Sequence, residues 1–61
     1  MKKDDIVRCT NGCEYRVNYV EEKIVGLTYV YWHDGFERYI ASEYCTYDTP
    51  IEYVKEIVCE A

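Results

Sequence analysis

The sequence predicts one small all-β domain spanning residues 1–61, and three features carry that prediction. Aromatic residues make up 16% of the chain, and eight of the ten are tyrosine, which is favoured in strands and at interfaces. Residues 14–20 alternate between apolar and polar side chains, the pattern of a half-buried strand. Asn11-Gly12 and Asp34-Gly35 are strong signals for tight hairpin turns. A chain of this length has room for one domain with a small core.

The first expected hairpin joins a strand over residues 5–9 to a second strand over residues 14–20. Strict alternation in the second strand places three apolar side chains on one face: Tyr15, Val17 and Tyr19. We expect Asn11-Gly12 to form a two-residue turn, which fixes the pairing between the two strands. A polar connection over residues 21–23 then leads to the next strand.

The four cysteines, Cys9, Cys13, Cys45 and Cys59, are expected to be free thiols. A two-residue turn pairs Cys9 with Glu14, so Cys9 and Cys13 point to opposite faces of the sheet and neither bond to each other nor share a metal ion. Zinc frameworks usually present two close cysteine pairs, whereas this chain has one. Zinc therefore requires a looser turn, and the lack of a recognisable secretory segment disfavours disulfides. We expect no metal and no cofactor.

The second expected hairpin is long and apolar on both faces. Its strands cover residues 24–33, where Gly26 indicates a bulge or a sharp bend, and residues 36–42. A two-residue turn at Asp34-Gly35 pairs His33 with Phe36. The two faces then carry Leu27, Tyr29, Tyr31, Phe36 and Ile40 on one side, and Val30, Trp32, Tyr39 and Ala41 on the other. One core can bury only one of these faces, so we expect the other to be covered by another element or exposed as a binding surface.

Two structures compete for the C-terminal segment. Thr49-Pro50-Ile51-Glu52 is a capping box with proline at the first helical position, which predicts that a helix begins here. Residues 54–58 also alternate well enough for a strand. We expect one helical turn over residues 50–53 followed by a last strand. The alternative is a helix over residues 50–59 packed on a four-stranded antiparallel sheet.

The segment from Pro50 to Ile57 resembles the end of SH3 domains, where a proline, two residues and a Tyr-Val pair lead through a short helical turn into the final strand. Asp5-Ile6-Val7 resembles the opening of small prokaryotic and phage SH3-like barrels, and both hairpins fit the same plan. This resemblance spans most of the chain and implies a five-stranded SH3-like barrel that binds a partner. Only Tyr53 matches a groove residue of the family, and the tryptophan pair after the central turn is absent. The small, acidic, tyrosine-rich chain also resembles phage-encoded host-interaction proteins.

The acidic charge is concentrated in the second half of the chain. Residues 1–33 hold five acids and five bases, whereas residues 34–61 hold seven acids and two bases, which accounts for the whole net charge of −5. This balance disfavours direct binding to nucleic acid, since phosphate contacts supply most of that affinity. It favours a basic surface on a larger protein. No apolar stretch is long enough to span a bilayer, so we expect a cytoplasmic protein without membrane contacts.

The expected function is that of a non-enzymatic protein-binding module, acting as a small inhibitor or adaptor. Aromatic side chains dominate binding energy at interfaces. The expected binding residues are Tyr31, Trp32, Tyr39, Tyr53 and Glu37, the last a carboxylate at the rim. No catalytic residue is expected, because His33, the only histidine, lies beside a tight turn where polar residues are common. The surplus of apolar surface also predicts a homo-oligomer.

Two other functions remain open. In the first, the chain forms an oligomer that sequesters a small nucleotide or other metabolite, which stacks on tyrosines while Arg8, Arg16 or Arg38 reaches the phosphates. Phage sponge proteins work on this principle. In the second, the chain is a DNA mimic, which requires carboxylates at phosphate-like spacing on one face.

Overall fold

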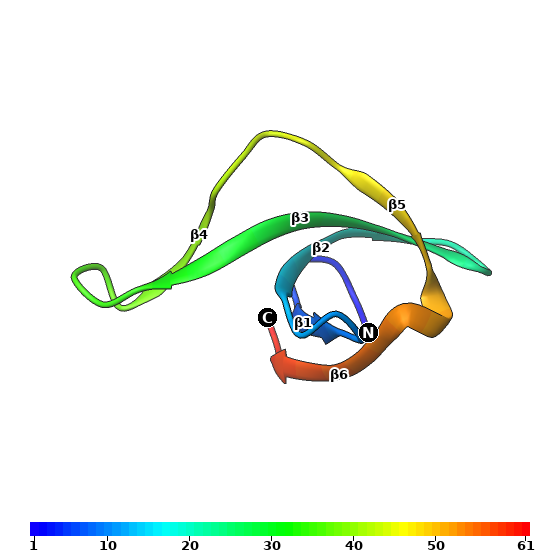
Figure 1. The fold of residues 1–61 in the computed structure, drawn as a ribbon, viewed down its shortest axis with the longest axis horizontal. Coiled ribbons are helices and arrows are strands. Elements are labelled where there is room, and N and C mark those ends of the chain that lie inside the picture. Colours follow the sequence, from blue (N-terminus) through cyan, green and yellow to red (C-terminus); the bar gives the residue numbers. More distant parts are fainter.

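The computed structural model describes residues 1–61 (Figure 1). The chain folds into six antiparallel strands and one short 3-10 turn. The strands are β1 (Ile6–Cys9), β2 (Glu14–Val20), β3 (Ile24–His33), β4 (Arg38–Ala41), β5 (Tyr47–Pro50) and β6 (Val54–Cys59), with the 3-10 turn η1 (Ile51–Tyr53) between the last two. Hydrogen bonds connect them in the order β4-β3-β2-β1-β6, and β5 also pairs with β3. The all-β prediction is therefore confirmed. The count of five strands is wrong by one, because the sequence did not predict β5.

The C-terminal segment is a strand preceded by a single turn, so the alternative of a helix over residues 50–59 is wrong. Pro50 ends β5 opposite Ile24, and the chain then passes through η1 into β6, which pairs with β1. Thr49 does not cap the turn, since its hydroxyl donates to the carbonyl of Tyr47 at 3.2 Å. Pairing with the open edge of β1 supplies ladder hydrogen bonds and packs Val54 against the core, whereas a helix of this length is marginal alone.

The core is a small cluster on the concave side of the sheet. Its buried members are Val7, Cys9, Val17, Val25 and Leu27, and Tyr15 and Val54 pack against it. Burial of each aliphatic member contributes about 1.5–3 kcal/mol. The core is small, and Tyr15, one of the tyrosines described below, packs at its edge.

A bulge in β2 changes the face on which Tyr19 lies. Val17 pairs with Leu27, but the next pairing joins Tyr19 to Gly26, so Asn18 is the extra residue. Tyr19 therefore lies on the face opposite Val17, and the prediction that both share one face is wrong. A Cβ atom at Gly26 would lie 2.3 Å from Cε1 of Tyr19, which shows that the ring occupies the space a side chain would need. The sequence placed a bulge or sharp bend in the strand that contains Gly26, whereas the irregularity lies opposite Gly26, in β2.

The first hairpin has a three-residue loop rather than a two-residue turn. Arg8 pairs with Glu14, and the N–H of Cys9 donates to the carbonyl of Cys13 at 3.1 Å. The N–H of Gly12 donates to the Cys9 carbonyl at 2.9 Å, and the φ of Gly12 is +85°, as in a type I turn followed by a glycine bulge. Cys9 and Cys13 thus face each other across the hairpin. The prediction that they point to opposite faces is wrong, although both thiols are free.

The second hairpin turns through four residues, 34–37, so its pairing differs by two residues from the expected one. His33 pairs with Arg38 rather than Phe36, and β4 begins at Arg38. The left-handed residue is Glu37, with a φ of +51°, and its N–H donates to the Asp34 carbonyl at 3.3 Å. A shift of two residues keeps every side chain on its predicted face. Trp32 and Tyr39 accordingly share a face, as expected, and pair directly.

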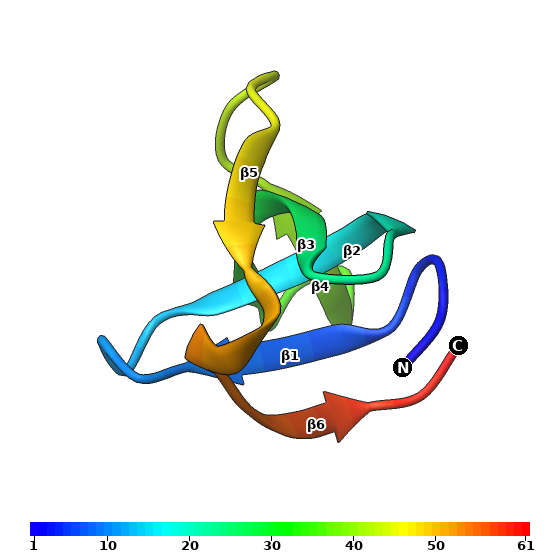
Figure 2. The ribbon, with the colours of Figure 1, turned by 90° about the vertical axis from the view of Figure 1, so that its right-hand side faces the viewer.

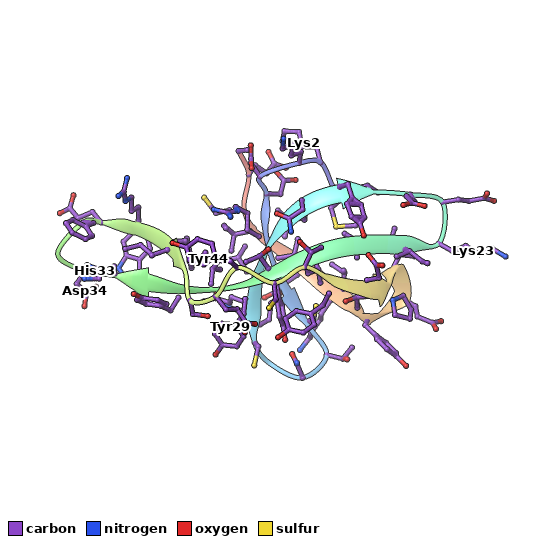
Figure 3. The ribbon with its side chains drawn as sticks, turned by 90° about the horizontal axis from the view of Figure 1, so that it is seen from above. Lys2, Lys23, Tyr29, His33, Asp34 and Tyr44 are labelled. Atoms are coloured by element: carbon purple, nitrogen blue, oxygen red, sulfur yellow. The ribbon has the colours of Figure 1, made fainter.

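The end of the β3–β4 hairpin extends beyond the rest of the sheet. In Figure 3, His33 and Asp34 lie at one end of the molecule and Lys23 lies at the other. We call the paired segments 30–33 and 38–41 the aromatic ribbon, because they carry half-exposed aromatic side chains, among them Trp32 with 49% of its surface exposed.

Asp5 joins the segment before β1 to the C-terminal end of the chain. Its buried carboxylate accepts the N–H of Ala61 at 2.9 Å and the N–H of Lys2 at 2.9 Å, and Lys2 Nζ lies 3.2 Å away. These donors, the Ala61 N–H above all, lower the pKa of Asp5 from 3.8 to about 2. Figure 2 shows the two ends of the chain side by side, with β1 and β6 beyond the end of β5 and running in a different direction from it.

Candidate functional site

Four tyrosines from four separate elements line an open groove of about 480 Å³. They are Tyr15 from β2, Tyr29 from β3, Tyr47 from β5 and Tyr53 from η1, and we call this site the tyrosine groove. Leu27 and Cys9 of the core lie in its lining, as do Thr10 and Asn11 of the first hairpin loop. The groove therefore lies where the β1–β2 loop, β5 and η1 meet.

Sheet pairing positions the first two tyrosines. Tyr15 and Tyr29 are paired across β2 and β3, and their rings meet edge to face with centroids 5.6 Å apart. Asn11 donates from Nδ2 to the hydroxyl oxygen of Tyr15 at 3.0 Å, which holds that ring against the hairpin loop. The neighbouring Cys13 thiol raises the pKa of the Tyr29 phenol. These contacts give two of the four rings a defined orientation before any ligand binds.

The other two tyrosines come from the segment after the aromatic ribbon. The N–H of Thr10 donates to the carbonyl of Tyr53 at 2.9 Å, which fastens η1 to the first hairpin loop. The hydroxyl of Tyr47 donates to Oε1 of Glu43 at 2.7 Å, and this hydrogen bond raises the pKa of the phenol to about 12. Glu43 is the only charged residue that lines the tyrosine groove.

The expected binding residues fall in two separate places. Tyr31, Trp32 and Tyr39 lie on the aromatic ribbon, where Trp32 and Tyr39 meet edge to face at 5.2 Å. Glu37 lies in the loop at the end of that ribbon. Of the expected binding residues, only Tyr53 lines the tyrosine groove, so the structure does not bring the predicted set together.

Sequence reasoning did not identify the other three tyrosines or Glu43 as site residues. A signal was available for one pair, since Tyr15 and Tyr29 both fall on predicted apolar faces of adjacent strands. No comparable signal existed for Tyr47 and Glu43, which belong to a segment without a predicted element. Their place in the site depends on β5, which returns the chain to β3.

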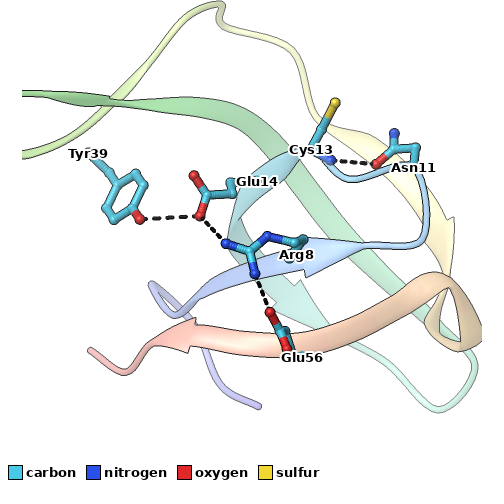
Figure 4. Close-up of polar contacts among 6 residues, drawn as sticks. All are labelled: Arg8, Asn11, Cys13, Glu14, Tyr39 and Glu56. Atoms are coloured by element: carbon cyan, nitrogen blue, oxygen red, sulfur yellow. Dashed lines mark hydrogen bonds and ion pairs between the residues drawn. The ribbon is translucent and has the colours of Figure 1, made fainter.

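None of the three candidate phosphate-binding arginines lines the tyrosine groove. Arg8 on β1 is paired with Glu14 on β2, at 3.1 Å, and with Glu56 on β6, so its guanidinium bridges three strands (Figure 4). Arg16 follows a groove tyrosine in β2 and so points to the opposite face. Arg38 lies with its guanidinium carbon 5.4 Å from the centroid of an aromatic ring in the hairpin loop.

His33, the only histidine, forms contacts within its own hairpin loop. His33 accepts the N–H of Phe36 at Nδ1, at 3.2 Å, and its ring stacks on the Phe36 ring at 4.4 Å, so it organises the hairpin loop. No group of three or more His, Cys, Asp or Glu side chains is placed to hold a metal ion. The fold contains no helix with the length and apolarity required to cross a membrane.

Comparison of the chain with protein-family models, with curated proteins and with solved structures gave no match.

Proposed function

We propose that this chain is a non-catalytic protein-binding module and that its recognition site is the tyrosine groove. The observation that carries the proposal is the convergence of four tyrosines from four elements on one open groove of about 480 Å³. Tyrosine supplies a large amphipathic contact area at a low cost in side-chain entropy, which is why it is enriched at recognition surfaces. A groove of this volume lies within the range of ligand sites.

The order of elements supports assignment of the fold to the small SH3-like barrels. Taken together, β4 and β5 correspond to one interrupted strand, and the six strands then reduce to the five of that plan. The turn η1 lies between the last two strands, as the resemblance implies. Tyr53, the one residue that matches a groove position of that family, lines the tyrosine groove. A module of this size acts by occupying a surface on a larger protein, and we assign it an inhibitor or adaptor role.

Peptides selected from a random library on the immobilised protein test this function. Their affinities are measured for the wild type and for Tyr53→Ala, whose side chain is half exposed and whose backbone contact to Thr10 is kept. We expect this substitution to weaken binding by about thirtyfold, the effect of losing a hot-spot aromatic residue.

Two control variants decide which surface binds. Tyr44→Ala removes a fully exposed tyrosine outside the groove, and Trp32→Ala removes the most exposed large side chain paired within the aromatic ribbon. Both variants should keep the wild-type affinity within twofold and an unchanged far-ultraviolet circular dichroism spectrum. Loss of binding in Trp32→Ala, with Tyr53→Ala unaffected, would move the site to the ribbon and contradict the proposal.

A further inference from the structure

The tyrosine groove contains one carboxylate with unused hydrogen-bonding capacity. Oε1 of Glu43 accepts the Tyr47 hydroxyl at 2.7 Å, and the chain provides no hydrogen bond or ion pair to Oε2. Because the Tyr47 hydroxyl donates its proton to Glu43, the phenol oxygen still has a lone pair to offer. The groove therefore offers a ligand two neighbouring hydrogen-bond acceptors, Oε2 of Glu43 and the hydroxyl oxygen of Tyr47. Neither group has a hydrogen left to donate to the ligand.

The aromatic rings of the groove favour a cationic ligand, as its carboxylate does. The face of a tyrosine ring carries negative electrostatic potential and attracts a cation within about 6 Å of its centroid. Four such rings line the groove, and no lysine, arginine or histidine lines it. The chain as a whole carries a net charge of −5, which adds a long-range attraction for cations.

The two acceptors favour a cation that carries N–H donors over one that carries none. A guanidinium is planar, presents five N–H donors, stacks on aromatic rings and sheds water more easily than an ammonium. A quaternary ammonium would contact the rings but could donate nothing to Glu43 or to the Tyr47 oxygen. We infer that the tyrosine groove binds the guanidinium of an arginine side chain on its protein partner, with Glu43 as its counter-ion. This inference rests on the groove being the recognition site.

Three capped amino acids serve as probes: N-acetyl-arginine methylamide, its neutral isostere N-acetyl-citrulline methylamide, and N-acetyl-trimethyllysine methylamide. Titration is followed by proton NMR of the tyrosine rings, which detects millimolar binding. The arginine probe should produce saturable shifts of the groove tyrosines. The citrulline probe should bind at least about tenfold more weakly, since hydrogen bonds to a charged group are the stronger kind. The trimethyllysine probe should also bind more weakly than arginine.

Isosteric variants test the counter-ion. Glu43→Gln removes the charge and should weaken arginine binding about tenfold or more. The matched control Glu22→Gln removes an equal charge from the exposed β2–β3 connection and should leave the affinity within twofold. Equal affinity for arginine and citrulline, tighter binding of trimethyllysine, or equal effects of the two substitutions would each overturn the inference.

The outcomes also separate this inference from the proposed function. If selected peptides lose affinity in Tyr53→Ala but contain no required arginine, the groove is the recognition site and the guanidinium assignment is wrong. If the arginine probe binds the groove but every selected peptide is insensitive to Tyr53→Ala, the proposed function is wrong although the groove accepts a guanidinium.

Discussion

The contact between Tyr19 and Gly26 gives a quantitative test of the fold. In Gly26→Ala, the new Cβ would lie 2.3 Å from Cε1 and 2.5 Å from Cζ of Tyr19, so the ring has to move off the strand. Forcing a methyl group into an occupied site costs about 1–3 kcal/mol. For a domain of this size, with net stability of roughly 3–5 kcal/mol, that is a large fraction. Each kcal/mol lost should lower the melting temperature by about 4–8 °C.

Gly26→Ala should increase the free energy of unfolding once the Tyr19 ring is absent. In a Tyr19→Ala background the space beside Gly26 is empty, and alanine is favoured over glycine in a strand interior by about 0.5–1 kcal/mol. Urea denaturation of the two single variants, the double variant and the wild type measures the coupling between the two sites. A Gly26→Ala variant that is equally destabilised in both backgrounds would refute the packing of Tyr19 over Gly26.

Three further predictions follow from ionisable groups. Asp5 has a folded-state pKa of about 2, below its ordinary 3.8, so its contribution to stability is complete above about pH 4 and is lost as the pH falls through about 2. Acid unfolding of Asp5→Asn should lack that part of the pH dependence, and a profile identical to wild type would contradict the hydrogen bonds described for Asp5. The Tyr47 phenol should titrate near pH 12 by ultraviolet absorbance and shift toward pH 10 in Glu43→Gln; an unchanged value would show that the hydrogen bond is absent. Burial raises the pKa of the Cys9 thiol, so iodoacetamide should label Cys9 more slowly than the exposed Cys45 by peptide mass mapping, and comparable rates would mean that Cys9 is accessible.

The positions of the early strands could be predicted because they depend on local composition. β2 occupies the alternating segment 14–20, and β3 occupies the β-branched and aromatic run 24–33, as the sequence indicated. β5 was missed because its residues, including Asp48 and Pro50, are depleted in strands. It forms because β3 extends beyond β4 and offers an edge that pairs with residues 47–50.

Register could not be predicted, because the same turn residues serve more than one loop. Gly12 adopts the left-handed conformation that both a two-residue turn and a three-residue loop with a bulge require. The one-residue difference brings Cys13 opposite Cys9, which no composition argument could reveal. In the second hairpin the left-handed residue is Glu37, although the glycine signal is at Gly35.

The candidate site could be predicted only in part, because the local sequence does not show which segments pair. Tyr53 could be assigned to a groove from its short motif, whereas Tyr47 reaches the groove only through β5. Of the other expected anchors, Tyr31 and Trp32 are exposed, as predicted, whereas Tyr39 is half-buried, and all three lie on the aromatic ribbon. The exposure of single side chains was therefore predicted better than which side chains meet.

The most direct test of the central claim is a map of amide chemical-shift changes when a selected peptide is titrated into the isotopically labelled protein. The tyrosine groove predicts the largest changes at Thr10, Leu27 and Thr49, which line it on three different elements. Changes confined to Trp32, Tyr39 and their neighbours on the aromatic ribbon, with the groove amides unmoved, would contradict the assignment of the recognition site.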